Sequence, residues 1–330
     1  MSKELAMQIH QYGDTDQIRP VEFDLSPPGP GEVRIRHTVI GVNFVDVYHR
    51  TGLYPLRELP ATLGVEAAGI IEAIGPEVSG LSLGQRVAYA GVPAGAYTTA
   101  RNMPADRVIA LPDNVADADA ASSLLRGITA HMLFQSVRTV HAGDSLLIHA
   151  AAGGLGQVLG QWLHNADVTL IGTVGSAKKA ELALSKGYHH VVEYKQDNFV
   201  DATLSLTAGR GVHYAVDGIG GATLRQTLQT VRPFGMVASV GQAAGRLEDK
   251  SQQLSLAELG PERCIALSRP SVVRYMSELA NYREGAQATV RQLQRGLKVD
   301  VSLSLPLQQA ASAHRQLEAG QTSGAVLLRP

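Results

Sequence analysis

A glycine-rich turn between two apolar runs is the stretch of the chain best suited to chemistry. Leu146, Leu147 and Ile148 predict a strand that is buried on both faces. The turn after it contains Ala152, Gly153, Gly154, Leu155 and Gly156, and apolar residues then recur at helical spacing. Ala151, Gly153 and Gly156 occupy the three positions of a G-x-G-x-x-G pattern. With a second apolar run from Val168, this order predicts a dinucleotide-binding βαβ unit, whose helix start offers backbone N–H groups to a pyrophosphate.

The end of the second apolar run indicates which dinucleotide is bound. An NAD site usually carries an acid there, which holds the ribose 2′-hydroxyl. Residues 172–179 contain no acid, but they include Gly175, Ser176 and Lys179. A cation, a hydroxyl and open backbone amides are what a 2′-phosphate needs, so we predict NADPH as the cofactor. The alternative is that Lys178 and Lys179 only form a solvated helix face.

Composition limits the class of protein. The chain has 330 residues, of which 45% are hydrophobic and 18% charged, as in a soluble globular protein with ample core. Its net charge of −1 argues against nucleic acid or an anionic membrane as a partner. We expect neither a signal peptide nor a membrane span. Cys264 is the single cysteine, which excludes internal disulfides and a cysteine zinc cluster and favours a cytoplasmic location.

The order of predicted elements is that of an α/β protein. Short apolar runs broken by Gly and Pro predict a mostly β barrel in the first 126 residues. Strands that alternate with helices through Val240 predict a doubly wound parallel sheet. Helices are predicted at Val272–Tyr282, Gln287–Gly296 and Leu307–Ala319, with a last strand at Ala325–Leu328. We therefore predict a discontinuous catalytic domain (1–126 and 270–330) and a Rossmann NADP(H)-binding domain (127–269).

The segment from Gly143 to Gln161 resembles the signature of the zeta-crystallin-like NADPH:quinone oxidoreductases, within the medium-chain dehydrogenase/reductase superfamily. Four more blocks agree, at 41–48, 51–55, 63–69 and 268–271, and the resemblance runs from about residue 5 to the C-terminus. It implies a GroES-like catalytic domain, a Rossmann domain, and usually a homodimer built through the nucleotide domains.

The residues at the positions of the metal ligands indicate the zinc-free branch of that superfamily. Zinc-dependent relatives use a Cys near position 43 and Gly-His-Glu near 64–66, whereas this chain has Asn43 and Gly64-Val65-Glu66. Without a Lewis acid, alcohol oxidation loses the group that stabilises its alkoxide. Quinones and conjugated enones are favoured as substrates, because their delocalised oxygen takes up the developing charge and a hydrogen bond suffices.

Candidate catalytic residues follow from the resemblance, which implies that Asn43, Tyr48 and Tyr54 lie near the nicotinamide. The Asn43 amide could hold the cofactor and polarise a carbonyl, and the tyrosines could orient the substrate or the cofactor. The alternatives are a turn-forming Asn and half-buried packing tyrosines. Asp46 and Arg50 are expected to pair with each other at helical i, i+4 spacing. Glu66 is expected to be a paired remnant of the metal site.

Further cofactor contacts are predicted by position. Thr129 could touch the nicotinamide or a phosphate, or simply start a helix. Tyr194 could lie near the adenosine phosphate, or cap the sheet edge. Gly241 ends a strand where open α/β sheets bind ligands. Ser268 and Arg269 could bind the carboxamide, or belong to a stiff hinge.

Three functions remain open from the sequence. The first is NADPH-dependent reduction of a quinone without metal. The second is delivery of the same hydride to the C=C bond of an enal or enone. The third is non-catalytic, as an NADPH-binding sensor or an RNA-binding protein, and the balanced charge argues against RNA.

Overall fold

The computed structural model describes residues 3–244 and 254–330 and divides the chain into two compact units. The first unit runs to Ile128 and includes Val273–Pro330, and the second is Thr129–Val272. Each unit is built around its own β-structure.

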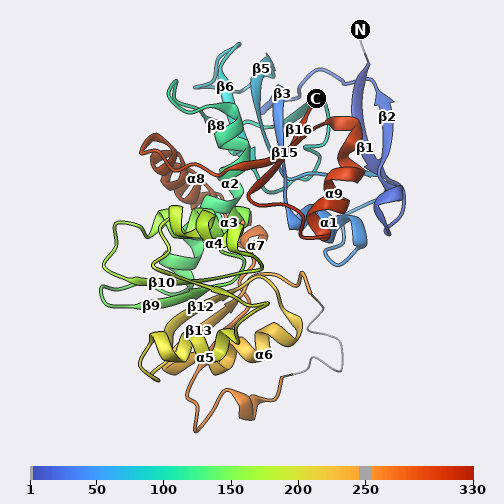
Figure 1. Cartoon of the computed structure of the whole chain (residues 1–330). Helices are drawn as coiled ribbons and strands as arrows, with labels where there is room; N and C mark the ends of the chain where they lie inside the picture. Colours follow the sequence, from blue (N-terminus) through green and yellow to red (C-terminus); the bar gives the residue numbers. More distant parts are fainter. Residues whose placement is uncertain (1–2, 245–253) are drawn as a thin grey trace. The chain divides into compact units, whose positions relative to one another are not determined.

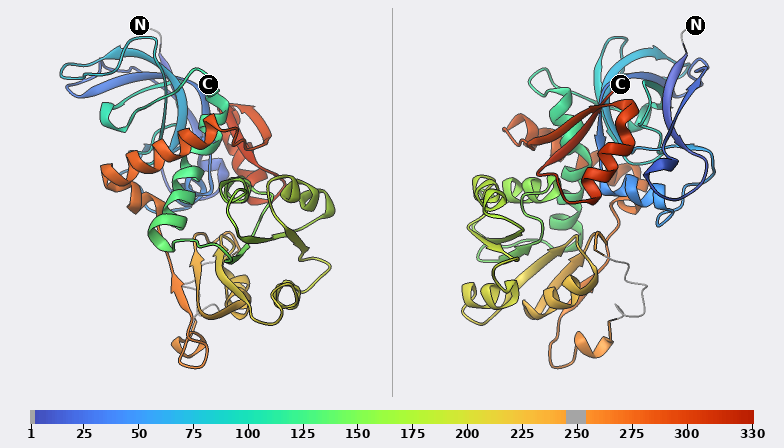
Figure 2. Two further views of the ribbon diagram at one scale, coloured as in Figure 1. Left: turned by 90° about the vertical axis from the view of Figure 1, so that its left-hand side faces the viewer. Right: turned by 45° about the vertical axis from the view of Figure 1, so that its right-hand side comes forward.

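The first unit contains a seven-stranded sheet in the order β15-β16-β3-β5-β6-β8, with β7 also paired to β3. These strands are β3 (Glu32–Val42), β5 (Glu66–Ile74), β6 (Arg86–Ala90), β7 (Ala100–Pro104), β8 (Ile109–Ala110), β15 (Val301–Pro306) and β16 (Ala325–Arg329). A smaller sheet has the order β2-β1-β4, from β1 (Glu4–Ile9), β2 (Arg19–Phe23) and β4 (Ala61–Thr62). In Figure 2 the red C-terminal strands lie beside the blue N-terminal ones, because β16 pairs with β3. Both ends of the chain therefore build one core.

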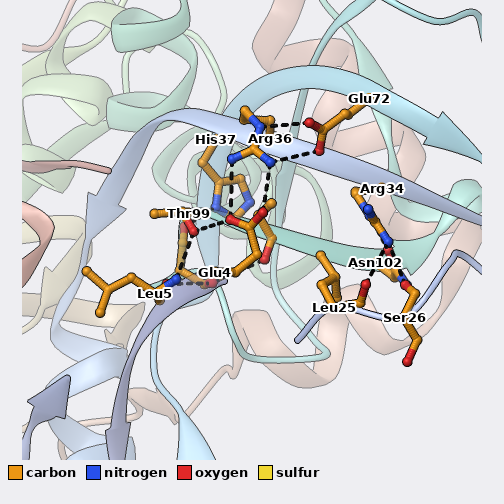
Figure 3. A network of polar contacts seen from close by, with 12 residues as sticks. Glu4, Leu5, Leu25, Ser26, Arg34, Arg36, His37, Glu72, Thr99 and Asn102 are labelled. Atoms are coloured by element: carbon orange, nitrogen blue, oxygen red, sulfur yellow. Dashed lines mark hydrogen bonds and ion pairs between the residues drawn. The ribbon is translucent and has the colours of Figure 1, made fainter. Parts of the chain in front are cut away.

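A polar network ties neighbouring strands of this unit together (Figure 3). Arg36 on β3 lies 2.8 Å from the carboxylate of Glu4 on β1 and 2.9 Å from that of Glu72 on β5. Thr99 also donates to Glu4. The hydrogen bond from Arg36 lowers the pKa of Glu4, so this nearly buried carboxylate is held in its charged form.

Four helices are the main ones of the first unit: α1 (Phe44–Thr51), α2 (Asp117–His131), α8 (Leu279–Gln294) and α9 (Ala310–Glu318). The predicted boundaries at 272–282 and 287–296 are wrong, because a short helix α7 (Val272–Ser277) ends before Glu278 and α8 then continues unbroken. Tyr282, Ala286, Thr289 and Leu293 form one buried stripe along α8. Gly285 lies within that helix, where a side chain would come within 3.1 Å of Ile128, so close packing outweighs the low helix propensity of glycine.

The second unit contains a six-stranded parallel sheet in the order β11-β10-β9-β12-β13-β14. Its strands are β9 (Ser145–Ile148), β10 (Thr169–Val174), β11 (His190–Glu193), β12 (Val212–Asp217), β13 (Val231–Ser239) and β14 (Ala266–Ser268). Numbered along the chain, this is the 3-2-1-4-5-6 order of a doubly wound Rossmann sheet. Helices α3 (Gly154–Trp162) and α4 (Ala177–Ser185) lie on one face, and α5 (Phe199–Leu206) and α6 (Gly221–Gln229) on the other (Figure 1). The predicted fold class is confirmed.

Candidate functional site

The glycine turn joins the carboxyl end of β9 directly to α3. Gly153 is the N-cap of α3, and its N–H donates to Ala150 O over 2.8 Å. A side chain on Gly156 would come within 2.4 Å of that same carbonyl oxygen, so only glycine lets the helix approach the turn this closely. Gly154 and Leu155 begin the helix and leave their N–H groups without intrahelical acceptors, as an anion site requires.

Most of the predicted cofactor residues lie at one edge of the parallel sheet, the edge formed by the carboxyl ends of its strands. Gly175 and Ser176 follow β10, Tyr194 follows β11, Gly241 lies two residues beyond β13, and Ser268 ends β14. All are at carboxyl ends of parallel strands, as is the glycine turn with Ala152. The strand order reverses between β9 and β12, and open sheets of this kind bind ligands at such a point.

Tyr194 stands against Gly175 at this edge. A Cβ atom on Gly175 would lie 2.8 Å from the Tyr194 hydroxyl. Tyr194 is nevertheless 53% exposed. Ser176 is the N-cap of α4, but its hydroxyl makes no capping hydrogen bond, and Lys179 lies in the first turn of that helix. These groups fit a 2′-phosphate, because two hydroxyls and a cation follow the adjacent strands β10 and β11, where residues 172–179 supply no carboxylate.

Thr129 lies inside α2, close to the carboxyl end of that helix, and is buried. The alternative that it starts a helix is therefore wrong. Because Thr129 lies in a helix, it is not among the residues at the carboxyl ends of the strands. Arg269 is, since it directly follows Ser268 at the end of β14.

A buried chain of hydrogen bonds beneath the glycine turn was not identified from the sequence. His149 follows β9, and its Nδ1 and Nε2 lie 2.8 Å from the hydroxyls of Thr173 and Thr227. Thr227 in turn donates to Asp217, whose other oxygen accepts from Ile219 N. Burial lowers the pKa of His149, so the ring is neutral and can donate to one threonine while it accepts from the other. These hydrogen bonds fix the carboxyl ends of β9, β10 and β12 relative to one another.

In the first unit, Asn43 is held by two carboxylates. It is the N-cap of α1, its backbone N–H donates to Asp46 over 2.8 Å, and its Nδ2 donates to Glu66 Oε2 over 2.8 Å. Because a carboxylate only accepts, the amide group must turn Nδ2 toward Glu66. Nδ2 carries two hydrogens, so one N–H of Asn43 is left for another acceptor.

Glu66 is completely buried and fully engaged, as expected for a paired residue. Its Oε1 accepts from Leu125 N over 2.7 Å, and its Oε2 lies 3.9 Å from the guanidinium of Arg126. Burial raises the pKa of Glu66, and the charge of Arg126 opposes that rise. Glu66 therefore connects β5, α2 and the N-cap of α1.

Tyr48 and Tyr54 are brought together beside this N-cap helix. Their ring centroids are 5.1 Å apart in an edge-on arrangement, and Tyr54 N donates to Tyr48 O over 3.1 Å. Phe44 extends the group, with its ring 6.3 Å from that of Tyr48. Tyr48 is buried and Tyr54 is half-buried. Both therefore pack like hydrophobic residues, and each carries a hydroxyl group that can form hydrogen bonds.

The expected pairing of Asp46 with Arg50 is wrong. Arg50 is buried and forms a bidentate ion pair with Glu318 on α9, at 2.7 and 2.8 Å. Asp46 instead accepts from Asn43 N and from the Tyr97 hydroxyl, and burial raises its pKa to about 7. The distant residues Tyr97 and Glu318, together with the N-cap residue Asn43, thus replace the i+4 pair, because both side chains are buried.

Within the described parts of the chain, no three His, Cys, Asp or Glu side chains gather closely enough to hold a metal ion. Among the same residues, no helix is long and apolar enough to cross a membrane.

Comparison with known proteins places this geometry in a family. The model for the alcohol dehydrogenase GroES-like domain matches residues 29–113, and the model for zinc-binding dehydrogenases matches residues 154–281. A quinone oxidoreductase of Pseudomonas aeruginosa is 34% identical, over 98% of this chain and 99% of its own length. The chain belongs to the quinone oxidoreductase family. It is an oxidoreductase, and its GroES-like unit and Rossmann sheet are those of the medium-chain dehydrogenase/reductases.

Two further proteins are similar to this chain along nearly its whole length. The quinone oxidoreductase of Escherichia coli, whose crystal structure is complexed with NADPH, superimposes with a TM-score of 0.93 at 33% identity, covering 99% of this chain and 100% of that one. A 2-haloacrylate reductase from a Burkholderia species is 37% identical, over 99% of both chains.

Proposed function

We propose that the protein reduces a quinone to a hydroquinone, with NADPH as the reductant and without a metal. The observation that carries the cofactor assignment is the acid-free end of β10, where Gly175 lies against the Tyr194 hydroxyl and is followed by Ser176 and Lys179. The quinone as substrate is supported by relatives of that name that match along nearly the whole chain.

Bound NADPH would supply a hydride, and the quinone needs one hydride and one proton to become a hydroquinone. Asn43 is proposed to donate its remaining Nδ2 hydrogen to the quinone carbonyl oxygen, where negative charge develops. The carboxylate of Glu66 fixes the direction of that hydrogen. Tyr48 and Tyr54 are proposed to pack against the flat ring, and water can supply the proton.

For the cofactor we propose contacts along the sheet edge. Ala152, Gly153, Gly154, Leu155 and Gly156 would bind the pyrophosphate; Gly175, Ser176, Lys179 and Tyr194 the 2′-phosphate; and Thr129, Gly241, Ser268 and Arg269 the nicotinamide half.

The test is NADPH oxidation at 340 nm with a panel of benzoquinones and naphthoquinones, for the wild type and for Asn43→Ala. We expect turnover of at least one quinone and a fall in kcat of about a hundredfold to a thousandfold in the variant, as for the loss of one oxyanion donor. If no quinone is turned over by protein that binds NADPH, the proposed reaction is wrong.

A second candidate is reduction of a conjugated C=C bond. It is favoured by the 37% identity to a 2-haloacrylate reductase. Both reactions would use the same cofactor residues, so only the substrate distinguishes them. A larger kcat/KM for 2-chloroacrylate or crotonaldehyde than for every quinone would replace the first proposal by the second.

We also propose a homodimer built through the second unit. Strand β14 ends the order of the parallel sheet, and nearby Phe234 is 88% exposed although its N–H is bonded to Cys264 O over 2.7 Å. A bare aromatic beside an edge strand suits a contact between two copies. Light scattering should give twice the chain mass for the wild type, and the monomer mass for Phe234→Asp.

We also propose a cytoplasmic location, which is supported by the exposed free thiol of Cys264.

A further inference from the structure

Lys195 lies at the same edge of the Rossmann sheet as the proposed 2′-phosphate site, although it is far from Lys179 in the chain. Pairing of β10 with β11 places Val174 opposite Glu193, and Tyr194 N then donates to Val174 O over 3.1 Å. A Cβ atom on Gly175 would lie 3.6 Å from Cε of Lys195 and 2.8 Å from the hydroxyl of Tyr194. Two consecutive side chains of the β11 end thus converge on Gly175.

The ammonium group of Lys195 is not neutralised by its surroundings. It forms no hydrogen bond or ion pair with any residue in 3–244 or 254–330, and its side chain is exposed. The nearest acid before it in the chain, Glu193, accepts a hydrogen bond from Gln196 over 3.1 Å. The cation therefore stands beside the hydroxyl of Tyr194 with no carboxylate to hold it there.

We propose that Lys195 is a specificity-determining residue that binds the 2′-phosphate of NADPH from the side opposite to Lys179. The inference rests on the proposed use of NADPH and adds a second cation to that site. Glycine at position 175 leaves room for the Tyr194 hydroxyl, because a Cβ atom there would come within 2.8 Å of it, and the 3.6 Å from that Cβ atom to Cε of Lys195 is an ordinary van der Waals contact. A phosphomonoester that carries nearly two negative charges is matched better by two lysines than by one.

The competing interpretation is a solvated surface lysine, which would affect every anionic ligand weakly and alike. The two interpretations differ in what they predict for ligands that share all groups except the 2′-phosphate. Adenosine 2′,5′-bisphosphate and AMP form such a pair, and NADPH and NADH form another.

The experiment is calorimetric titration of the full-length protein with adenosine 2′,5′-bisphosphate and with AMP, repeated with NADPH and NADH by fluorescence. Lys195→Ala should weaken the 2′-phosphorylated ligands by about tenfold and leave the others within about twofold. The loss should shrink as salt is raised, since the site is exposed. Lys195→Arg should retain most of the preference.

Lys186→Ala is the matched control, because it removes the same charge from the same unit at the far end of α4. Equal losses for adenosine 2′,5′-bisphosphate and AMP in Lys195→Ala, or a loss no larger than in Lys186→Ala, would overturn the role of Lys195 while a wild-type preference for NADPH leaves the proposed function standing. A wild type that binds NADH as tightly as NADPH would overturn both.

Discussion

The carboxylate of Glu66 should be irreplaceable even by its own amide. It is completely buried and accepts hydrogen bonds from Leu125 N and from Nδ2 of Asn43, one on each oxygen. Glutamine has a single oxygen, so in Glu66→Gln one of these donors must face an NH₂ group. The substitution keeps size and shape and changes only charge and acceptor number.

The expected cost follows from those contacts. A buried donor left without an acceptor costs about 1–3 kcal/mol. Glu66→Gln also removes the charge that faces buried Arg126, and breaking a buried pair in this way brings the expected loss of unfolding free energy to about 3–5 kcal/mol. Glu72→Gln is the matched control, because Glu72 pairs with Arg36 on the surface with 39% of its side chain exposed, where we expect less than about 1 kcal/mol.

The assay must report on the correct unit. Trp162, the single tryptophan, lies on α3 in the second unit, so its fluorescence does not follow the loss. Hydrogen exchange of the Leu125 amide reports on the first unit directly, and urea unfolding followed by circular dichroism includes that unit because it follows the helices and strands of both units. Exchange at Leu125 should accelerate by at least about a hundredfold in Glu66→Gln. If Glu66→Gln and Glu72→Gln differ by less than about 1 kcal/mol, the role assigned to the buried carboxylate is refuted.

Three further outcomes are expected. Burial raises the pKa of Asp46 to about 7, so the folded state binds its proton more tightly than the unfolded state. The contribution of Asp46 to the free energy of unfolding should therefore fall by on the order of a few kcal/mol as pH rises from about 4 to 7. Urea unfolding at about pH 4 and about pH 7 should show this fall in the wild type and not in Asp46→Asn. Lys179→Ala should weaken NADPH by about tenfold and NADH by less than twofold in fluorescence titrations, and equal effects would contradict the 2′-phosphate assignment. Gly156→Ala should lower thermal stability and NADPH affinity far more than Gly153→Ala, because its Cβ would lie 2.4 Å rather than 3.0 Å from Ala150 O; calorimetric scans that rank them in reverse would argue against the tight turn.

The elements that could be predicted from the sequence are those set by local patterns. Local sequence alone predicts three consecutive features: the strand at Leu146–Ile148, the glycine turn and the helix after it. The apolar run, the glycines and the helical spacing of apolar residues each favour one backbone conformation without tertiary contacts. Alternation of such units along the chain also predicted the doubly wound sheet, because short crossovers permit few topologies. The predicted helix bounds at 282 and 287 are wrong because α8 runs through Gly285, where close packing against Ile128 favours a glycine inside a helix.

The partners of charged and polar side chains were decided by tertiary structure. Arg50 matched Asp46 by spacing but binds Glu318, and Asn43 is oriented by Glu66, because strand register and helix packing determine which groups share a low-dielectric interior. Lys195 reaches Gly175 only through the pairing of β10 with β11. The sequence by itself determined the kind of fold and the turn that would bind a dinucleotide; the tertiary structure decided which distant side chains meet there, since backbone periodicity is local and side-chain proximity is not.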